Sequence, residues 1–256
     1  MFGIEFLKTY PDTFDWMYID SSRRDTQKNK KFLIEDCSPN VITYQSLFFK
    51  HAKNVLIKMS PMLDISVGLT ALKHVKTVYI VAVKNEVKEL LFLQQKGFDG
   101  TATLHTLNNH PKSTEHFSFE IPQEESAEAM FSTPKAYLYE PNAAVMKSGA
   151  FKLISEKFKL DKLDPHTHLY TSNEKIDNFP GKIYEISNCY PYQKKSLKKV
   201  IGSLKANVKT RNFSERIESL KTLFKLTDGG DLYLFFTTSN DKKVVVECRL
   251  AKFRNL

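Results

Sequence analysis

The sequence FDWMYIDSSRR, at residues 14–24, is an apolar run that ends on an acid and continues into a polar loop. The apolar residues before Asp20 are typical of a buried strand. Open α/β sheets bind ligands at the carboxyl ends of their strands. The segment therefore predicts a cleft at Asp20, lined by Ser21, Ser22, Arg23 and Arg24. The competing interpretation is that Asp20 only caps a helix or a turn.

A second polar loop follows the apolar strand expected at residues 54–59. Lys58 lies near the end of that strand, and a Ser-Pro turn then leads to Asp64. Neighbouring parallel strands end at the same edge of a sheet, so we expect Lys58 and Asp64 to line the cleft at Asp20. Alternatively, Lys58 extends from an edge into solvent and Asp64 caps the next helix. Two polar loops at one edge favour the cleft.

Short apolar strands alternate with helical segments through the first half of the chain. Strands are expected at 14–20, 54–59, 77–83, 101–107 and 116–121, and helices at 41–51, 69–75 and 85–96. Asn85 would cap the last of these helices, and Gly97 would end it. This pattern predicts an α/β fold with a parallel sheet covered on both faces. Residues 121–135 are acidic, rich in small residues and flanked by prolines, which indicates a linker.

The second half has a compact α+β pattern. A short strand at 137–141 precedes Asn142, which could cap a single helix over 143–158. Glu140 and Asn142 could instead contact a substrate. From residue 181, strands at 183–186, 207–210, 232–237 and 243–249 alternate with helices at 192–204 and 215–224. We divide the chain into residues 1–135, 136–180 and 181–256.

The net charge of +9 is confined to one end of the chain. Lys and Arg balance Asp and Glu up to residue 180, whereas the last 76 residues contain 16 Lys and Arg against 7 Asp and Glu. The helix expected from residue 192 contains no acid, and tyrosines precede it. Such a surface suits RNA phosphates, with base stacking on the tyrosines. The candidate RNA-binding residues are Lys194, Lys195, Lys198, Lys199, Lys205, Lys209 and Arg211. The alternative is a lysine-rich surface that serves only solubility.

Several motifs resemble those of class I S-adenosylmethionine-dependent methyltransferases that carry a ferredoxin-like segment and a THUMP-like domain. They are YIDSSRR (18–24), EDCSP (35–39), KMSPMLD (58–64), YEPNAAVMKSGAF (139–151), HLYTS (168–172) and DGGD (228–231). The resemblance implies a partial Rossmann-like methyltransferase sheet, followed by small α+β ferredoxin-like and THUMP-like domains. It also implies S-adenosylmethionine as cofactor and a structured RNA, such as tRNA or rRNA, as substrate.

The same resemblance assigns roles to the strand-end residues. Asp20 would contact the attacking atom of the substrate or hold the loop, and Arg23 and Arg24 would engage phosphate. Lys58 and Asp64 would line the same cleft. We therefore take Asp20, Ser21, Ser22, Arg23 and Lys58 as catalytic candidates. The substrate-binding candidates are Arg24, Asp64, Glu140 and Asn142.

The chain departs from this family in two places. Ser21 occupies the position where relatives have a proline, which loosens the loop. Only 13 residues precede the strand that resembles the fourth of the usual seven, and they contain no glycine-rich cofactor loop. We expect the cofactor-binding half to be missing and the chain alone to bind S-adenosylmethionine weakly or not at all. The alternative function is a non-catalytic RNA-binding or scaffold protein derived from such an enzyme.

Other features narrow the class of protein. The longest apolar run, near residues 78–83, is too short for the roughly 20 residues of a membrane helix, and the N-terminus does not resemble a secretory signal. Cys37, Cys189 and Cys248 have no metal-binding spacing, which argues against structural zinc and disulfides. We expect a cytoplasmic protein.

Overall fold

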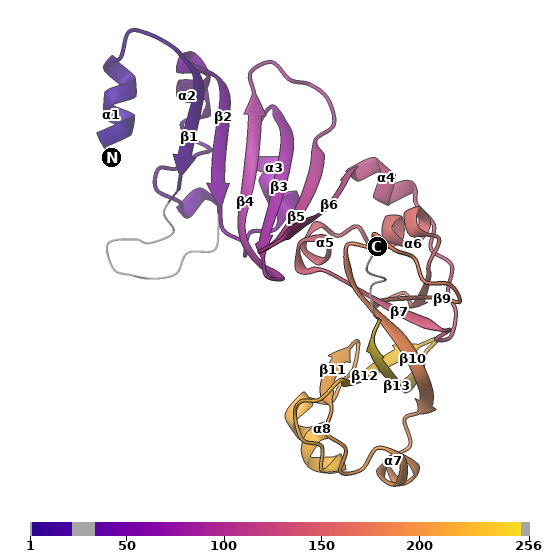
Figure 1. Cartoon of the computed structure of the whole chain (residues 1–256). Coiled ribbons are helices and arrows are strands. Elements are labelled where there is room, and N and C mark those ends of the chain that lie inside the picture. Colours follow the sequence, from indigo (N-terminus) through magenta and orange to yellow (C-terminus); the bar gives the residue numbers. More distant parts are fainter. Residues whose placement is uncertain (1, 22–33, 252–256) are drawn as a thin grey trace. The chain divides into compact units, whose positions relative to one another are not determined.

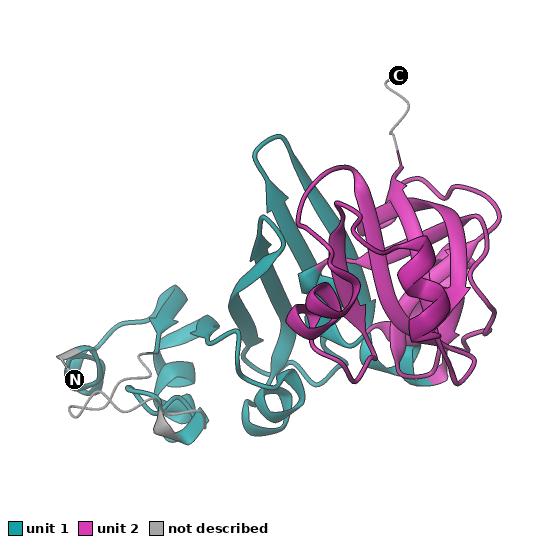
Figure 2. Ribbon diagram, turned by 90° about the horizontal axis from the view of Figure 1, so that it is seen from below, with its two compact units in different colours: residues 1–125, 143–149 teal, residues 126–142, 150–256 magenta. Residues whose placement is uncertain are grey.

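The computed structural model describes residues 2–21 and 34–251 of the chain. They form two compact units (Figure 2): residues 1–125 with 143–149 are unit 1, and residues 126–142 with 150–256 are unit 2. Each unit is built on its own mixed β-sheet. The protein is therefore of the α/β class. No helix in the described ranges is both long and apolar enough to cross a membrane.

Unit 1 contains a six-stranded sheet in the order β1-β2-β4-β3-β5-β6 (Figure 1). Its strands are β1 (Phe14–Asp20), β2 (Ala52–Met59), β3 (Val75–Val83), β4 (Glu86–Gln95), β5 (Thr103–His110) and β6 (Ser113–Glu120). β1 is parallel to β2 and β3 is parallel to β5, whereas β4 and β6 are antiparallel to their neighbours. The prediction of a parallel sheet is therefore wrong in part.

The segment predicted as a helix at 85–96 is β4. Burial alternates from residue to residue along β4, and Phe92 is fully buried. This two-residue period is typical of a strand in a sheet that is covered more on one face than on the other. Lys84 and Asn85 have positive φ angles of 50° and 65° and form a tight hairpin turn between β3 and β4. Asn85 caps a different helix, because its Oδ1 accepts a hydrogen bond from Ala143 N at 2.7 Å.

One face of the unit 1 sheet is fully buried and the other is partly open. Val55, Ile80 and Phe92 on the first face are 0% exposed. Helix α3 lies against this face so closely that a Cβ on Gly68 would come within 2.4 Å of the Phe92 ring. Tyr79, on the opposite face, is only half-buried. The helices are α1 (Phe2–Thr9), η1 (Ile34–Asp36), α2 (Gln45–His51), α3 (Ile65–Ala71), α4 (Ile121–Ser126) and α5 (Ala143–Ser148). Helix α4 occupies part of the expected linker.

Unit 2 contains a seven-stranded sheet in the order β11-β12-β13-β10-β7-β9-β8. Its strands are β7 (Tyr137–Pro141), β8 (Asp161–Asp164), β9 (Thr167–Ser172), β10 (Gly181–Pro191), β11 (Asn207–Arg211), β12 (Leu232–Ser239) and β13 (Lys242–Leu250). The long strand β10 pairs with β7 on one side and with β13 on the other. The strands before and after residue 180 therefore share one sheet.

Three helices accompany this sheet: α6 (Phe151–Phe158), α7 (Lys194–Val200) and α8 (Ile217–Phe224). The single helix predicted over 143–158 is wrong. It is interrupted at Gly149, whose φ of +80° favours glycine, so that α5 belongs to unit 1 and α6 to unit 2. Leu197 of α7 and Phe224 of α8 pack with Phe236 in one apolar core. The DGGD motif is the turn before β12, with both glycines at positive φ.

Candidate functional site

The ends of β1 and β2 bring three predicted residues together. Asp20 and Lys58 are register partners in the parallel pair, and Lys58 Nζ lies 2.6 Å from Asp20 Oδ2. Ser21 Oγ donates a hydrogen bond to the Lys58 carbonyl oxygen at 2.9 Å. The hydrogen bond to Asp20 raises the pKa of Lys58, which keeps it cationic. The prediction that these residues share one sheet edge is confirmed by the geometry, whereas their catalytic roles stay predictions.

Carboxylates hold the Lys58 ammonium on two sides. Glu89 of β4 lies 4.0 Å from Lys58 Nζ, on the opposite side of β2 from Asp20. Lys58 is three-quarters buried, while Asp20 is 54% exposed. The carboxylate of Asp20 is therefore fixed by Lys58 and still accessible as a hydrogen-bond acceptor. Ser22, Arg23 and Arg24 lie outside the described residues.

Asp64 caps helix α3. Its Oδ1 accepts hydrogen bonds from Ser66 N at 2.8 Å and Ser66 Oγ at 2.7 Å, and these bonds lower the pKa of Asp64. It also lines a depression of 240 Å³ with Lys147 and Glu124. No hydrogen bond or ion pair of the described chain joins Asp64 to Asp20 or Lys58. The contacts of Asp64 are therefore those of a helix cap, and its role in substrate binding stays a prediction.

A larger depression of 460 Å³ lies along β1, at the free edge of the sheet. Its lining is mainly apolar and includes Ile4, Phe6, Leu7 and Trp16, with Asp20 as its acidic group. Trp16 is 58% exposed. Sequence reasoning treated this strand as buried and missed its exposed aromatic side chains, because a hydrophobic run alone does not show that the strand lies at an edge.

Glu140 is the centre of a buried polar network in unit 2. Lys209 Nζ contacts Glu140 Oε2, Arg211 Nη2 lies 2.6 Å from Glu140 Oε1, and Tyr184 OH donates to Glu140 Oε2 at 3.0 Å. Lys209 Nζ also lies 5.3 Å from the centre of the Phe235 ring. Burial lowers the pKa of Lys209, against the raising effect of Glu140.

This network changes the interpretation of three predicted residues. Lys209 and Arg211 were expected to bind RNA, but their cationic groups are bound to Glu140. Glu140, expected to contact substrate, is only 6% exposed and forms ion pairs with both of them. Asn142 is also buried, and its backbone N donates to Pro180 O at 3.0 Å. Lys209, Glu140 and Asn142 are therefore largely covered, whereas the Arg211 side chain is 43% exposed and its RNA-binding role stays a prediction.

Helix α7 presents four of the other predicted cations to solvent. Lys194, Lys195, Lys198 and Lys199 are all exposed, while Leu197 anchors the helix in the core at 1% exposure. Lys194 Nζ lies 3.6 Å from Glu215 Oε1. Lys205 is also exposed, and its side chain lies against Gly229. We define the α7 surface as Lys194, Lys195, Lys198 and Lys199. It is the candidate nucleic-acid interface of unit 2.

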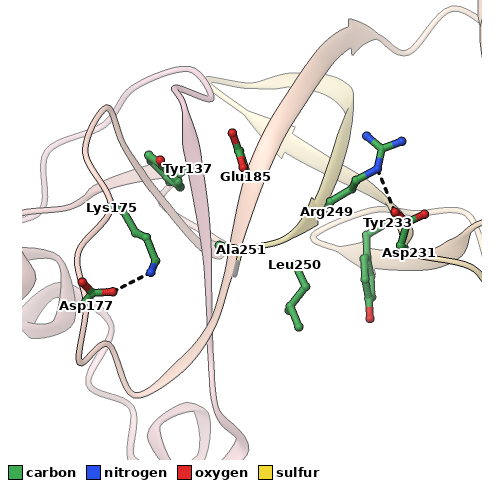
Figure 3. Close-up of a pocket in the computed structure, with 9 residues that line it drawn as sticks. All are labelled: Tyr137, Lys175, Asp177, Glu185, Asp231, Tyr233, Arg249, Leu250 and Ala251. Atoms are coloured by element: carbon green, nitrogen blue, oxygen red, sulfur yellow. Dashed lines mark hydrogen bonds and ion pairs between the residues drawn. The ribbon is translucent and has the colours of Figure 1, made fainter. Parts of the chain in front are cut away.

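One depression of unit 2 was not predicted. It has a volume of 880 Å³, and Figure 3 shows its lining residues, which come from β7, β10, β12, β13 and the adjoining loops. Its cations are already paired with acids: Lys175 with Asp177 at 2.8 Å and Arg249 with Asp231 at 3.2 Å. Apart from Asp231 of the DGGD motif, no sequence motif marks these residues, since they meet only through the pairing of strands far apart in the chain.

Comparisons with known proteins identify the C-terminal part of the chain. Residues 137–180 match a ferredoxin-like domain family, and residues 181–250 match a THUMP domain-like family. A comparison with curated proteins gives no significant match. These matches confirm the ferredoxin-like and THUMP-like domains expected from the sequence motifs.

A solved structure extends the relationship to nearly the whole chain. It is described as a "putative methyltransferase" from Porphyromonas gingivalis W83, with 32% sequence identity and a TM-score of 0.84. The match covers 93% of the present chain and 60% of that chain. The present protein is therefore a relative of that protein, with a THUMP-like domain, and it spans about 60% of the relative's length.

Proposed function

We propose that this protein takes part in S-adenosylmethionine-dependent methylation of RNA, such as tRNA or rRNA, and contributes the side of the site that holds the RNA. The observation that carries this proposal is the match, over 93% of the chain, to the solved structure described as a "putative methyltransferase". The THUMP-like domain and the exposed lysines of α7 support RNA as the substrate. We place the protein in the cytoplasm, because the scattered cysteines are all free.

The side chains that line the depression beside Asp20 fit S-adenosylmethionine poorly. The depression beside Asp20 is lined mainly by apolar side chains, and Gly3, the glycine nearest to it in sequence, lies within α1 rather than in a strand-to-helix turn. The cofactor's carboxylate and ribose hydroxyls need polar partners. The proposed roles of this chain therefore concern the acceptor RNA and not the binding of the cofactor.

In this proposal, Asp20 orients the acceptor nucleotide. Lys58 fixes the carboxylate at the strand end at 2.6 Å, and the exposed oxygen of Asp20 can accept a hydrogen bond from an amine or a hydroxyl group. Holding the acceptor in a fixed position lowers the barrier of a transfer reaction, mainly through its entropy. Ser21 supports the geometry by bonding to the Lys58 carbonyl.

Labelled methyl transfer to total RNA, measured with the product of the complete reading frame, tests this proposal. Asp20→Asn should lower the rate by about 100-fold, because an amide orients the acceptor less well than a carboxylate. Glu89→Gln is the matched control: Glu89 also faces Lys58, but at 4.0 Å, so the rate should change little. Equal rates for Asp20→Asn and the parent protein would reject the role of Asp20. Absence of transfer to any RNA would reject the proposed activity.

A second prediction concerns the 256-residue chain alone. Because its described depression at β1 has few polar groups, calorimetric titration should show no micromolar affinity for S-adenosylmethionine. A dissociation constant in the micromolar range would contradict this expectation.

The alternative function is a non-catalytic RNA-binding or scaffold protein. It is favoured by the contrast between the exposed basic surface of α7 and the mainly apolar lining of the depression beside Asp20. RNA binding without methyl transfer by the complete gene product would select this alternative.

A further inference from the structure

We propose that the α7 surface holds RNA through its phosphates alone and does not read or stack bases. This inference rests on the proposed RNA-binding function and specifies how the RNA is held. It corrects the expectation that tyrosines beside α7 stack on bases.

The lysines of α7 form one continuous cationic face. With 100° per residue, positions 194, 195, 198 and 199 fall within an arc of roughly 140°, while Leu197 points into the core. The pairs Lys194–Lys198 and Lys195–Lys199 are one turn apart, where like charges repel. Among the described residues, no carboxylate lies within 4.0 Å of Lys195, Lys198 or Lys199, and Lys194 has only Glu215 at 3.6 Å. Bound phosphates would relieve this repulsion.

The tyrosines beside α7 are engaged elsewhere. Tyr192 OH donates to Glu215 at 2.8 Å, and its ring packs edge-on against Phe213 with the ring centres 5.0 Å apart. Lys194 Nζ lies over the same ring at 6.0 Å. Tyr190 OH donates to Glu247 at 3.1 Å, and this ring packs on the apolar core. Each hydroxyl group is already engaged and each ring is partly covered, which disfavours base stacking at both tyrosines.

Elsewhere in the THUMP-like domain, the aromatic side chains are poorly exposed, and the exposed arginines Arg211, Arg216 and Arg249 lie outside α7. Within residues 181–250 of the described chain, every aromatic side chain is buried or half-buried. Helix α7 also contains lysine but no arginine, so it lacks the planar fork that stacks on bases and recognises them through paired hydrogen bonds. Lysine acts as a point charge that suits phosphate. The chemistry of the surface therefore fits a sugar-phosphate backbone of any sequence.

Fluorescence anisotropy with a labelled single-stranded RNA and an abasic ribose-phosphate oligomer of the same length tests the inference. Neutralising three lysines of the α7 surface, in K195Q/K198Q/K199Q, should weaken the binding of both oligomers by the same factor, within twofold. The logarithm of the affinity should fall with the logarithm of the salt concentration with a slope of about −2 to −3, as expected for three or four neutralised phosphates. The triple variant K195Q/K198Q/K199Q should flatten that slope by about 2.

A matched triple variant, K53Q/K96Q/K112Q, removes the same charge from exposed lysines of unit 1 and should leave the slope unchanged. Glutamine has nearly the helix propensity of lysine, so α7 should persist, which a circular dichroism spectrum would verify. A loss of affinity in this α7 variant at least tenfold greater for RNA than for the abasic oligomer would overturn the inference while leaving RNA as the substrate. Binding of neither oligomer would overturn both the inference and the proposed RNA partner.

Discussion

Replacing Glu140 with alanine should destabilise unit 2 by about 3–5 kcal/mol, the usual cost of removing one partner from a buried ion pair. Glu140 is 6% exposed, and the side chain of Lys209 is 24% exposed. Without the carboxylate, the Lys209 ammonium would remain among Tyr184, Tyr233 and Phe235 with no acid to neutralise it. Its low-dielectric surroundings make that unpaired charge costly.

Hydrogen-exchange mass spectrometry in increasing urea can measure the effect in each unit separately. Peptides from β7 and β11 should lose protection in the Glu140→Ala variant, while peptides from β3 in unit 1 should not change. Asp231→Ala is the matched control, since its ion pair with Arg249 is largely exposed and should contribute less than about 1 kcal/mol.

A compensating variant separates the ion pair from other effects of the substitution. Glu140→Leu combined with Lys209→Met replaces both buried charges with apolar groups, and such replacements are often neutral or stabilising. The double variant should recover most of the lost stability. Arg211, which is 43% exposed, can then be solvated by water. If Glu140→Ala cost no more than Asp231→Ala, the network would not hold β7 and β11 together.

The strands of the protein were easier to predict than its sheet order. The strand at 137–141 was predicted with the bounds that the structure shows, because Pro141 and Asn142 end an apolar run. β4 was predicted as a helix, since its Glu, Lys, Leu and Gln residues favour helices in isolation. Pairing with β2 and β3 on both sides overrides that preference.

The candidate sites show a similar limit. Asp20 and Lys58 could be placed together because the ends of adjacent parallel strands meet. The ion pairs of Lys209 and Arg211 with Glu140 could not be predicted, since Glu140 precedes these residues by 69 and 71 positions in the sequence. Net charge cannot distinguish a cation that neutralises a buried acid from one that faces solvent. The α7 lysines were predicted correctly as exposed because Leu197 defines the buried side of a short helix.

A second large effect is expected when the pH is lowered, through His168 in β9. Burial, and then the nearby charges of Lys162 and His166, lower the pKa of His168 to about 4. Above pH 6.5, the imidazole is neutral in both the folded and the unfolded chain, so its contribution to stability is fully present. Between pH 6.5 and 4 the unfolded chain takes up a proton that the folded chain excludes. Stability is therefore lost across this range, by at most about 3 kcal/mol.

The variant His168→Phe should lose less stability than the parent protein between pH 7 and pH 4.5. His168 stacks on Phe151 with ring centres 3.6 Å apart, and its buried Nδ1 has no hydrogen-bond partner, so a phenyl ring keeps the contact and removes the titration. Urea unfolding of both proteins at pH 7 and pH 4.5 measures the stability lost by each. The contributions of the other histidines are the same in both proteins and cancel when the two losses are subtracted. The exposed His166→Gln variant should keep most of the acid sensitivity. If His168→Phe and the parent protein lost equal stability between pH 7 and pH 4.5, groups other than His168 would cause the acid sensitivity, because the substitution removes only the titration of His168.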